Sequence, residues 1–453
     1  MKQPTYTLNE THRLDLKSWL ACANGHKDFP IQNLPFGVFQ KANDKRKCCG
    51  IAIGDYVIDM HKLWCERIFT GLAEQASEAL KDENLNRFMA MGEEVSSAIR
   101  LAISQGLREG STHKSALTRA LIPMTEITMQ MPCHIGDYTD FYSSINHATS
   151  VGKLFRPENP LLPNYKWIPI AYHGRASSIC VSGTQVKRPN GQVKANSTTQ
   201  PVLQPTERLD YEVELGILIG KKASPFGSVN ITHAEQHLFG VCLLNDWSAR
   251  DIQAWEYQPL GPFLSKNFMS SISPWIISSE ALCPFRCAMQ REEQDQQTMD
   301  YLSCEQNVQL GALDIQMECY ISTAQMRRDN LPATKLSQTS FKHSFWTIAQ
   351  MITHHTVNGC GLNAGDLLGT GTQSGPTPDE AGSLLELSQG GQQQITITES
   401  EQRTFLQDGD EIELRGFCQN ASGLRIGLGS VIGRVISGHS SQYYSNPNGH
   451  FSQ

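Results

Sequence analysis

The sequence of 453 residues lacks the features that would indicate a nucleic-acid-binding, membrane or secreted protein. It contains 38 Lys and Arg against 45 Asp and Glu, so its net charge of −7 gives no basic field for non-specific binding to nucleic acid. No apolar run approaches the roughly 18 residues of a membrane span, and the polar start, MKQPTYTLNE, contains no stretch of the signal-peptide type. We therefore expect a cytoplasmic protein that binds neither nucleic acid nor membrane.

Cysteine patterns typical of disulfide frameworks or zinc knuckles are also absent. The 13 cysteines include no Cys-x-x-Cys pair, and a disulfide framework normally has an even number of cysteines in a short secreted chain. We interpret most of these thiols as small buried hydrophobic side chains.

Two segments approach known motifs without fulfilling them. Gly369–Gly375 is rich in glycine, but it is not a GxGxxG pattern, and Pro376 follows where a nucleotide-binding helix should start. We interpret this segment as a Gly-rich turn. His233 and His237 are four residues apart on a predicted helix, but no Glu occupies the position that a zinc-protease motif needs. We interpret them as ordinary surface histidines.

What the sequence does contain is enough hydrophobic residues, 39%, for a sizeable core. The polar residues 1–27 predict an N-terminal extension, and residues 28–130 predict a first domain that combines a small β barrel with helices. Residues 131–440 predict a large second domain, and residues 441–453 a tail. The expected class is mainly β (α+β).

Local patterns predict the main elements. The recurrence of apolar residues predicts helices at Asn86–Ile103 and Phe341–His355. Alternation predicts strands at Tyr211–Gly220 and Glu411–Phe417, and a hairpin lies within Gly50–Asp59. The polar segment Met289–Met299 is interpreted as a poorly packed surface loop.

Carboxylates at strand positions carry the first chemical signal. Glu212 and Glu214 are two residues apart, so a strand places both on one face, where two like charges repel unless water or a cation compensates them. From this run alone, a solvated outer face of the sheet is the favoured interpretation. Asp246 at a strand end and Asp140 in an aromatic turn are each typical of turns or caps. If the four converge, their oxygen-only donor set selects Mg²⁺, Mn²⁺ or Ca²⁺ rather than zinc.

Possible proton-transfer and anion-binding groups lie near these carboxylates in the sequence. His147 follows Asp140 by seven residues and can act as a general base, although a lone His is usually structural. Arg250, Gln253 and Lys266 follow Asp246, and such donors suit an anionic substrate and a developing oxyanion. Salt bridging within a loop remains an alternative for the charged donors.

Several strings closely resemble the fumarylacetoacetase family, and the resemblance extends from about Asp28 to Val435. They are Asp28–Phe39, Gly136–Ser144, Ala171–Ser178, Asn245–Gln253, Gly261–Leu264, Thr353–Gly359 and Asp408–Glu411. The resemblance implies an N-terminal SH3-like β barrel, a C-terminal mixed β-sandwich roll and a homodimer. It also implies hydrolysis of the diketo acid 4-fumarylacetoacetate to fumarate and acetoacetate, the last step of tyrosine and phenylalanine degradation.

The resemblance assigns a role to each candidate residue. The ligands of an active-site Ca²⁺ (or Mg²⁺) fall on Asp140, Glu212, Glu214 and Asp246, and a second, structural Mg²⁺ falls beside Asp246, Lys266 and Ser270. The catalytic histidine falls on His147 and its partner on Glu386, and the oxyanion donors fall on Arg250, Gln253 and Lys266. Substrate contacts fall on Tyr142, Arg156, Tyr172, Gln253, Tyr257 and Thr372.

The sequence departs from the family at Ser270, where the family has Thr, in its longer N-terminal extension and in the Gln- and Glu-rich loop Met289–Met299. Three other functions stay open. The first is a related decarboxylase or hydratase that acts on 2-oxo or unsaturated acids with the same fold. The second is a non-enzymatic, metal-stabilised β protein, and the third is a cation-independent esterase, for which a nucleophile motif is missing.

Overall fold

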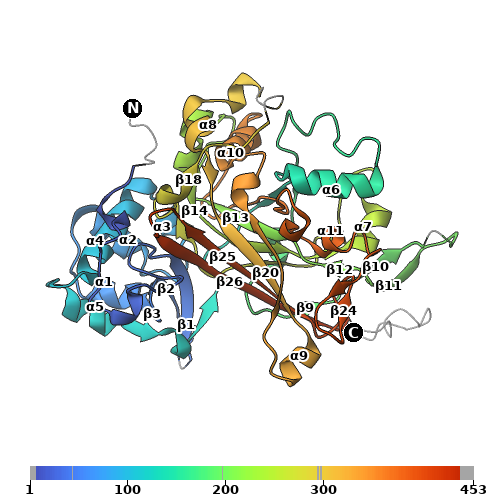
Figure 1. The fold of residues 1–453 in the computed structure, drawn as a ribbon. Coiled ribbons are helices and arrows are strands. Elements are labelled where there is room, and N and C mark those ends of the chain that lie inside the picture. Colours follow the sequence, from blue (N-terminus) through green and yellow to red (C-terminus); the bar gives the residue numbers. More distant parts are fainter. Residues whose placement is uncertain (1–6, 43, 196, 293–294, 296–297, 439–453) are drawn as a thin grey trace, which may run out of the picture.

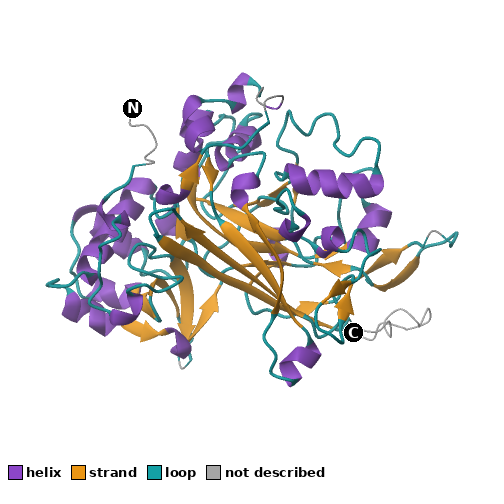
Figure 2. Cartoon of the chain, viewed as in Figure 1, coloured by secondary structure: helices purple, strands orange, loops and turns teal. Residues whose placement is uncertain are grey.

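A computed structural model describes residues 7–42, 44–195, 197–292, 295 and 298–438. In this part of the chain the fold is a strand-rich α+β fold (Figures 1 and 2). Two large sheets lie against each other, and the N-terminal helices and strands, drawn in blue in Figure 1, gather at one side of them.

The central sheet has eight strands among the described residues, in the order β7-β6-β22-β13-β14-β16-β8, with β17 paired to β14. Their bounds are Ala171–His173 (β7), Tyr138–Phe141 (β6), Leu367–Gly369 (β22), Val213–Ile219 (β13), Leu238–Asp246 (β14), Ser270–Ile272 (β16), Ile179–Val181 (β8) and Ile277–Ser278 (β17). The second sheet has the order β21-β20-β25-β26-β9. Its strands are Thr334–Ser340 (β21), Gln316–Ser322 (β20), Glu411–Gln419 (β25), Arg425–Ile436 (β26) and Val186–Lys187 (β9).

Helices and short strand pairs surround these sheets. The helices are Ile145–Phe155 (α6), Arg250–Glu256 (α7), Glu305–Leu310 (α8), Ala324–Arg328 (α9), Ile348–Thr356 (α10) and Leu384–Leu387 (α11). The short pairs are Asn190–Val193 (β10) with Val202–Pro205 (β11), Leu209–Asp210 (β12) with Ser248–Ala249 (β15), Arg286–Cys287 (β18) with Ala312–Leu313 (β19), and Ile395–Thr396 (β23) with Gln402–Arg403 (β24).

The N-terminal part contains a five-stranded sheet of order β4-β3-β2-β1-β5. Its strands are Leu121–Pro123 (β4), Tyr56–Asp59 (β3), Lys47–Ile53 (β2), Phe36–Lys41 (β1) and Ile127–Gln130 (β5). Its helices are Met60–Cys65 (α1), Gly71–Ala79 (α2), Asn86–Met89 (α3), Glu93–Leu107 (α4) and Lys114–Ala120 (α5). The predicted hairpin is confirmed, because β2 and β3 pair with Ile53 opposite Tyr56 across a two-residue turn.

The two faces of the central sheet pack against different hydrophobic cores, and the Glu214 carboxylate of strand β13 lies on one of these faces. Leu215 on β13 and Leu243 on β14 face the second sheet and share a core with Leu414 of β25. Leu218 and Leu244 face the other way and pack with the N-terminal core. Glu214 lies on this same second face, because side chains two apart in a strand point the same way.

Two predicted helices are shorter than their periodicity suggested. The expected helix Asn86–Ile103 is broken into α3 and α4, because Gly92 has φ +85°, a conformation that interrupts a right-handed helix. The expected helix Phe341–His355 is a 3₁₀ turn at Phe341–His343 followed by α10. The hydroxyl of Thr347 caps the new start by accepting a bond from the Gln350 N–H.

The predicted N-terminal extension and the loop interpreted as poorly packed both contact the rest of the fold where they are described. In the predicted extension, Trp19 donates from its indole and its backbone N–H to α4 carbonyls, and Ala23 is fully buried. In the polar loop 289–299, the Arg291 guanidinium lies 4.1 Å from the ring centre of Phe345, and Asp295 accepts a 2.5 Å bond from Lys166. Several neighbours of Asp295 lie outside the described residues.

All 13 cysteines are free thiols, and seven of them are buried: Cys48, Cys49, Cys133, Cys242, Cys283, Cys319 and Cys418. Within the described ranges, no helix has the length and hydropathy needed to cross a membrane. The interpretation of His237 as a surface histidine is wrong, because it is buried in a 3₁₀ helix, Ile231–His237, where its Nδ1 lies 2.8 Å from the backbone carbonyl oxygen of Lys221.

Candidate active site

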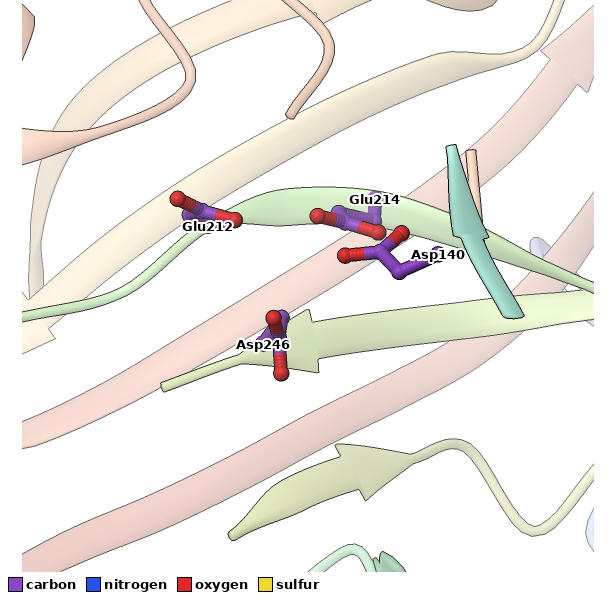
Figure 3. Close-up of side chains that lie close together, drawn as sticks. All are labelled: Asp140, Glu212, Glu214 and Asp246. Atoms are coloured by element: carbon purple, nitrogen blue, oxygen red, sulfur yellow. The ribbon is translucent and has the colours of Figure 1, made fainter. Parts of the chain in front are cut away.

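Four carboxylates from neighbouring strands meet in one buried cluster (Figure 3). Asp140 lies on β6, Glu214 on β13 and Asp246 at the end of β14, and Glu212 directly precedes β13. One oxygen from each lies within 4.8 Å of the others. The favoured interpretation of Glu212 and Glu214 as a solvated sheet face is therefore wrong, because both are buried.

Strand order and one glycine bring the carboxylates together. β22 lies between β6 and β13, with Gly369 opposite both Asp140 and Gly216. A Cβ at Gly369 would lie 2.3 Å from Asp140 Oδ1, so only glycine leaves room for that carboxylate to extend over β22 toward Glu214. Asp246 is opposite Ser270 in the β14–β16 ladder, and the Ser270 hydroxyl donates a 2.6 Å bond to Asp246 Oδ1.

Two of the carboxylates are paired with buried cations. Lys266 Nζ lies 2.5 Å from Glu212 Oε2 and 3.0 Å from Asp246 Oδ2, and Arg250 Nη1 lies 2.8 Å from Glu212 Oε1. Burial opposes the charge of Glu212, but Lys266 and Arg250 outweigh it and hold the pKa of this carboxyl well below its ordinary value. Burial also opposes the charge of Lys266, but Asp246 and Glu212 raise the pKa of its ammonium group.

The other two carboxylates have no such partner. Among the described residues, no lysine or arginine forms an ion pair with Asp140 or Glu214. The Gly371 N–H lies 3.1 Å from Asp140 Oδ1 and 3.1 Å from Glu214 Oε2, while Glu214 Oε1 has no hydrogen-bond partner. Burial, together with the neighbouring carboxylates, raises the pKa of both groups well above their ordinary values.

This donor set fits a hard divalent cation. The cluster offers only carboxylate oxygens, which suit Mg²⁺ or Ca²⁺, and it contains no thiolate or imidazole of the kind that zinc prefers. Buried carboxylates without partners are costly, and a dication would compensate the charge that Asp140 and Glu214 carry when ionised. The orphaned Glu214 Oε1 is an available ligand atom.

His147 and Glu386 form a buried pair beside the cluster. His147 Nδ1 lies 2.8 Å from Glu386 Oε2, and both side chains are 4% exposed. Glu386 also accepts bonds from the hydroxyls of Ser374 (3.0 Å) and Ser383 (2.8 Å). Burial opposes the charge of Glu386, but His147 and these hydroxyls outweigh it and hold the pKa of this carboxyl below its ordinary value. His147 is close enough to Glu212 to lower the pKa of that carboxyl as well.

Four of the residues predicted to contact substrate lie around this centre. The Tyr142 ring meets the His147 ring edge-on, with centroids 5.3 Å apart, and the Tyr172 hydroxyl donates a 2.8 Å bond to Asp246 Oδ2. Gln253 Oε1 accepts a 3.2 Å bond from Arg250. Thr372 is buried, and its hydroxyl has no hydrogen-bond partner.

The other two predicted contact residues are exposed and bonded within their own loops. Arg156 Nη2 donates to the Pro160 carbonyl at 3.3 Å, although its charge also acts on Tyr142. The Tyr257 hydroxyl accepts a 3.2 Å bond from Gln258. The structure therefore brings these two side chains to the periphery and not to the carboxylate cluster.

Comparison with known proteins identifies the family. Residues 138–436 match the family model described as fumarylacetoacetate (FAA) hydrolase C-terminal, and residues 32–132 match the one described as fumarylacetoacetase N-terminal. The chain belongs to the fumarylacetoacetate hydrolase family. The resemblance inferred from the sequence strings is thus confirmed.

Relatives within the fumarylacetoacetate hydrolase family match nearly the full chain. The fumarylacetoacetase of Dictyostelium discoideum is 45% identical over 430 residues, which cover 93% of this chain and 98% of that protein. The fumarylacetoacetase of Caenorhabditis elegans is 45% identical over 418 residues, with 91% and 97% covered. The human fumarylacetoacetase is 41% identical over 418 residues, with 90% and 96% covered.

Sequence reasoning missed one contributor to this family's site, the Gly-rich segment 369–375. It is a turn, as expected, but its Gly371 N–H binds two carboxylates and its Ser374 hydroxyl binds Glu386. Gly371 has φ +73°, and a Cβ there would lie 2.1 Å from the Phe141 carbonyl oxygen. The available signal was three glycines, Gly369, Gly371 and Gly375, interleaved with hydroxyl residues, a pattern that brings backbone donors close to a ligand.

Proposed function

We propose that this chain is a metal-dependent hydrolase that cleaves a carbon–carbon bond of 4-fumarylacetoacetate to give fumarate and acetoacetate. The observation that carries the proposal is the buried cluster of four carboxylates beside the His147–Glu386 pair. Identities of 41–45% to fumarylacetoacetases over about nine-tenths of the chain support the choice of substrate. A merely structural metal site would not require a histidine held by a buried glutamate.

The proposed ligands of an active-site Ca²⁺ or Mg²⁺ are Asp140, Glu212, Glu214 and Asp246. When bound, such a cation would polarise the two oxygens of a β-diketone. We assign the second, structural Mg²⁺ to the vicinity of Asp246, Lys266 and Ser270. Because the Lys266 ammonium offers donors only, a cation there would use carboxylate, hydroxyl or backbone oxygens.

His147 is the proposed general base. With Nδ1–H donated to Glu386, the other ring nitrogen, Nε2, carries the lone pair that accepts a proton from water. Glu386 fixes this tautomer and stabilises the imidazolium that forms. The water oxygen adds to the carbonyl carbon, and collapse of the adduct breaks the carbon–carbon bond. The electron pair leaves with the acetoacetate carbon, which then takes up a proton.

The proposed oxyanion donors are Arg250, Gln253 and Lys266, which lie on or just beyond α7. Arg250 Nη2 is buried and has no hydrogen-bond partner, so it can donate to a charge that develops in the transition state. Lys266 adds a buried positive charge. The proposed substrate contacts are Tyr142, Arg156, Tyr172, Gln253, Tyr257 and Thr372, of which Arg156 and Tyr257 would act from the periphery.

We also propose the finer organisation that the family resemblance implies. An SH3-like barrel domain spans residues 28–130 and a β-sandwich roll spans residues 131–440, with the extension 1–27 and the tail 441–453 at the ends. The tail lies outside the described residues. We further propose a homodimer that acts in the cytoplasm.

An assay of the purified protein tests the proposed function. Incubation with 4-fumarylacetoacetate should yield equal amounts of fumarate and acetoacetate, measured by chromatography. A chelator should abolish turnover, and added Mg²⁺ or Ca²⁺ should restore it. No turnover with either ion, or full turnover in the presence of chelator, would contradict the proposal.

A further inference from the structure

A buried aspartate outside the carboxylate cluster contacts both the proposed oxyanion donor Arg250 and the helix that carries Glu386. Asp210 ends β12 and is fully buried. Its Oδ2 accepts bonds from Arg250 Nε at 2.9 Å and from the Leu385 N–H at 3.0 Å. Its Oδ1 accepts a bond from the Leu384 N–H at 2.8 Å.

The first of these contacts orients the guanidinium of Arg250. Asp210 takes the Nε–H, while Nη1 is shared by Glu212 and the Gln253 amide oxygen. Because Nε and Nη1 are both held, the planar group has a fixed orientation, and the unpartnered Nη2 points in one direction. Without Asp210, the guanidinium could rotate about its bond to Glu212.

The second contact positions the partner of the base. Leu384 and Leu385 are the first two residues of α11, and Glu386 follows them directly. Asp210 therefore accepts two of the backbone N–H groups that no residue within this short helix can satisfy. The orientation of the helix sets where the Glu386 carboxylate meets His147.

We propose that Asp210 is a positioning residue that holds Arg250 and Glu386 in one fixed relation, so that the oxyanion donor and the water activated by the general base meet at the same substrate carbonyl group. The inference rests on the proposed function. A single carboxylate is suited to this role because it accepts several bonds at once, and in a dry interior these charge-assisted bonds are strong.

The variant Asp210→Asn tests the inference, because it keeps the shape but replaces one acceptor oxygen by a donor. We expect kcat to fall about 10–100-fold, as for other groups that orient catalytic residues, while KM changes less than about 3-fold. The reason for this split is that Arg250 acts on charge present only in the transition state.

Asp410→Asn is the matched control. Asp410 is 1% exposed, accepts bonds from Arg403 Nε (2.8 Å) and Nη2 (2.9 Å), and accepts one backbone bond from the Gln407 N–H. It thus resembles Asp210 in burial and partners but contacts no site residue through these bonds. Its loss should lower the melting temperature and leave the kcat of the folded protein near that of wild type.

A second pair of variants removes one contact without changing Asp210. Leu384→Pro deletes the N–H that Asp210 accepts, at a first helical position where proline is tolerated and after a residue, Ser383, that is already extended. Leu384→Ala creates a comparable loss of side-chain packing and keeps the N–H. We expect the proline variant to have a kcat about 10-fold below that of the alanine variant.

A double variant with Arg250→Lys separates positioning from general destabilisation. If Asp210 acts through Arg250, adding Asp210→Asn to Arg250→Lys should lower kcat by less than it lowers the wild-type kcat, because only the part that acts through Glu386 remains. Multiplicative losses, or a kcat of Asp210→Asn equal to that of Asp410→Asn, would overturn the inference. If Asp210→Asn fails to fold, equal kcat values for the two Leu384 variants would overturn it. An inactive wild type would instead overturn the proposed function on which the inference rests.

Discussion

The two carboxylate pairs of the cluster are buried alike but neutralised differently. Glu212 and Asp246 contact Lys266, and Glu212 also contacts Arg250. Among the described residues, Asp140 and Glu214 have no cationic partner, both accept from the N–H of Gly371, and Glu214 Oε1 has no hydrogen-bond partner. The chain therefore neutralises one pair with its own cations, and the other pair is the one that could take a cation from solution.

This difference indicates which carboxylates are neutralised by the folded chain itself and which need a bound cation to carry their charge. A buried charge that loses its partner is strongly destabilising, whereas removing one member of an uncompensated pair relieves repulsion. The cation-paired half, Glu212 and Asp246, should stay ionised in the folded chain with or without metal. The cation-free half, Asp140 and Glu214, should depend on the metal for its ionised state.

The largest expected effect separates the base from both carboxylate pairs. His147→Ala should lower kcat by about 10²–10⁴-fold, because it removes the proton acceptor. Metal affinity, measured by calorimetry with Mg²⁺ or Ca²⁺, should stay near that of wild type, because imidazole is not a ligand in this account. Asp246→Ala should weaken metal binding and activity together. Near-wild-type turnover of His147→Ala, or loss of its metal, would contradict this division of roles.

A variant of the cation-paired half should damage the fold. Glu212→Gln leaves Lys266 and Arg250 with an uncompensated buried charge, which typically costs about 3–5 kcal/mol. The free energy of unfolding in urea should fall by this amount both with chelator and with saturating metal. A loss seen only in the presence of metal would show that Glu212 matters as a ligand alone.

The equivalent variant of the cation-free half should behave differently. Glu214→Gln should stabilise the chelated protein by about 1 kcal/mol, a typical size for a single substitution, because a neutral group replaces one of two adjacent carboxyls. With saturating metal the sign should reverse, because a ligand is lost. Melting temperatures of the wild type and of Glu214→Gln, with chelator and with saturating metal, measure this reversal of sign. Equal destabilisation under both conditions would exclude the proposed difference between the two carboxylate pairs.

A smaller effect should appear in the pH dependence of the chelated protein. The pKa values of Asp140 and Glu214 are raised in the folded chain, so the folded chain binds more protons than the unfolded chain above about pH 4. Their contribution to stability is present at low pH and is lost as the pH rises through the raised pKa values. Glu212 has the opposite sign, because its lowered pKa gives stability that is lost as the pH falls below about 4. Glu214→Gln should flatten the decline on the alkaline side, and an unchanged profile would argue against raised pKa values.

Local sequence patterns predict part of the arrangement of the carboxylate cluster. The spacing of Glu212 and Glu214 places both on one strand face, and Val213 and Leu215, which alternate with them, predict the core on the other face. Periodicity cannot show that this face is buried, because the groups that cover it, among them Arg250, Lys266 and Gly371, come from distant segments of the chain. Nor can it bring Asp140 to Glu214, since that contact depends on β22 inserting between β6 and β13 through residues far apart in the chain.

Backbone conformation accounts for the rest of what the sequence did not predict. The turn at Gly371 could be recognised as glycine-rich, but its carboxylate-binding N–H follows from its positive φ in the folded chain. Asp210 continues the spacing of Glu212 and Glu214, yet its partners Arg250, Leu384 and Leu385 come from two distant segments. The strings that resemble the fumarylacetoacetate hydrolase family identified the cluster more directly than any local rule.

Counting the protons released on metal binding tests whether Asp140 and Glu214 depend on a bound cation for their ionised state. Calorimetric titration with Mg²⁺ or Ca²⁺ at neutral pH, in two buffers of different ionisation enthalpy, gives the number of protons displaced per ion. We expect a net release in wild type, because Asp140 and Glu214 must ionise to bind the cation, and a smaller release in Glu214→Gln. Binding without proton release, or equal release in the two proteins, would contradict this expectation.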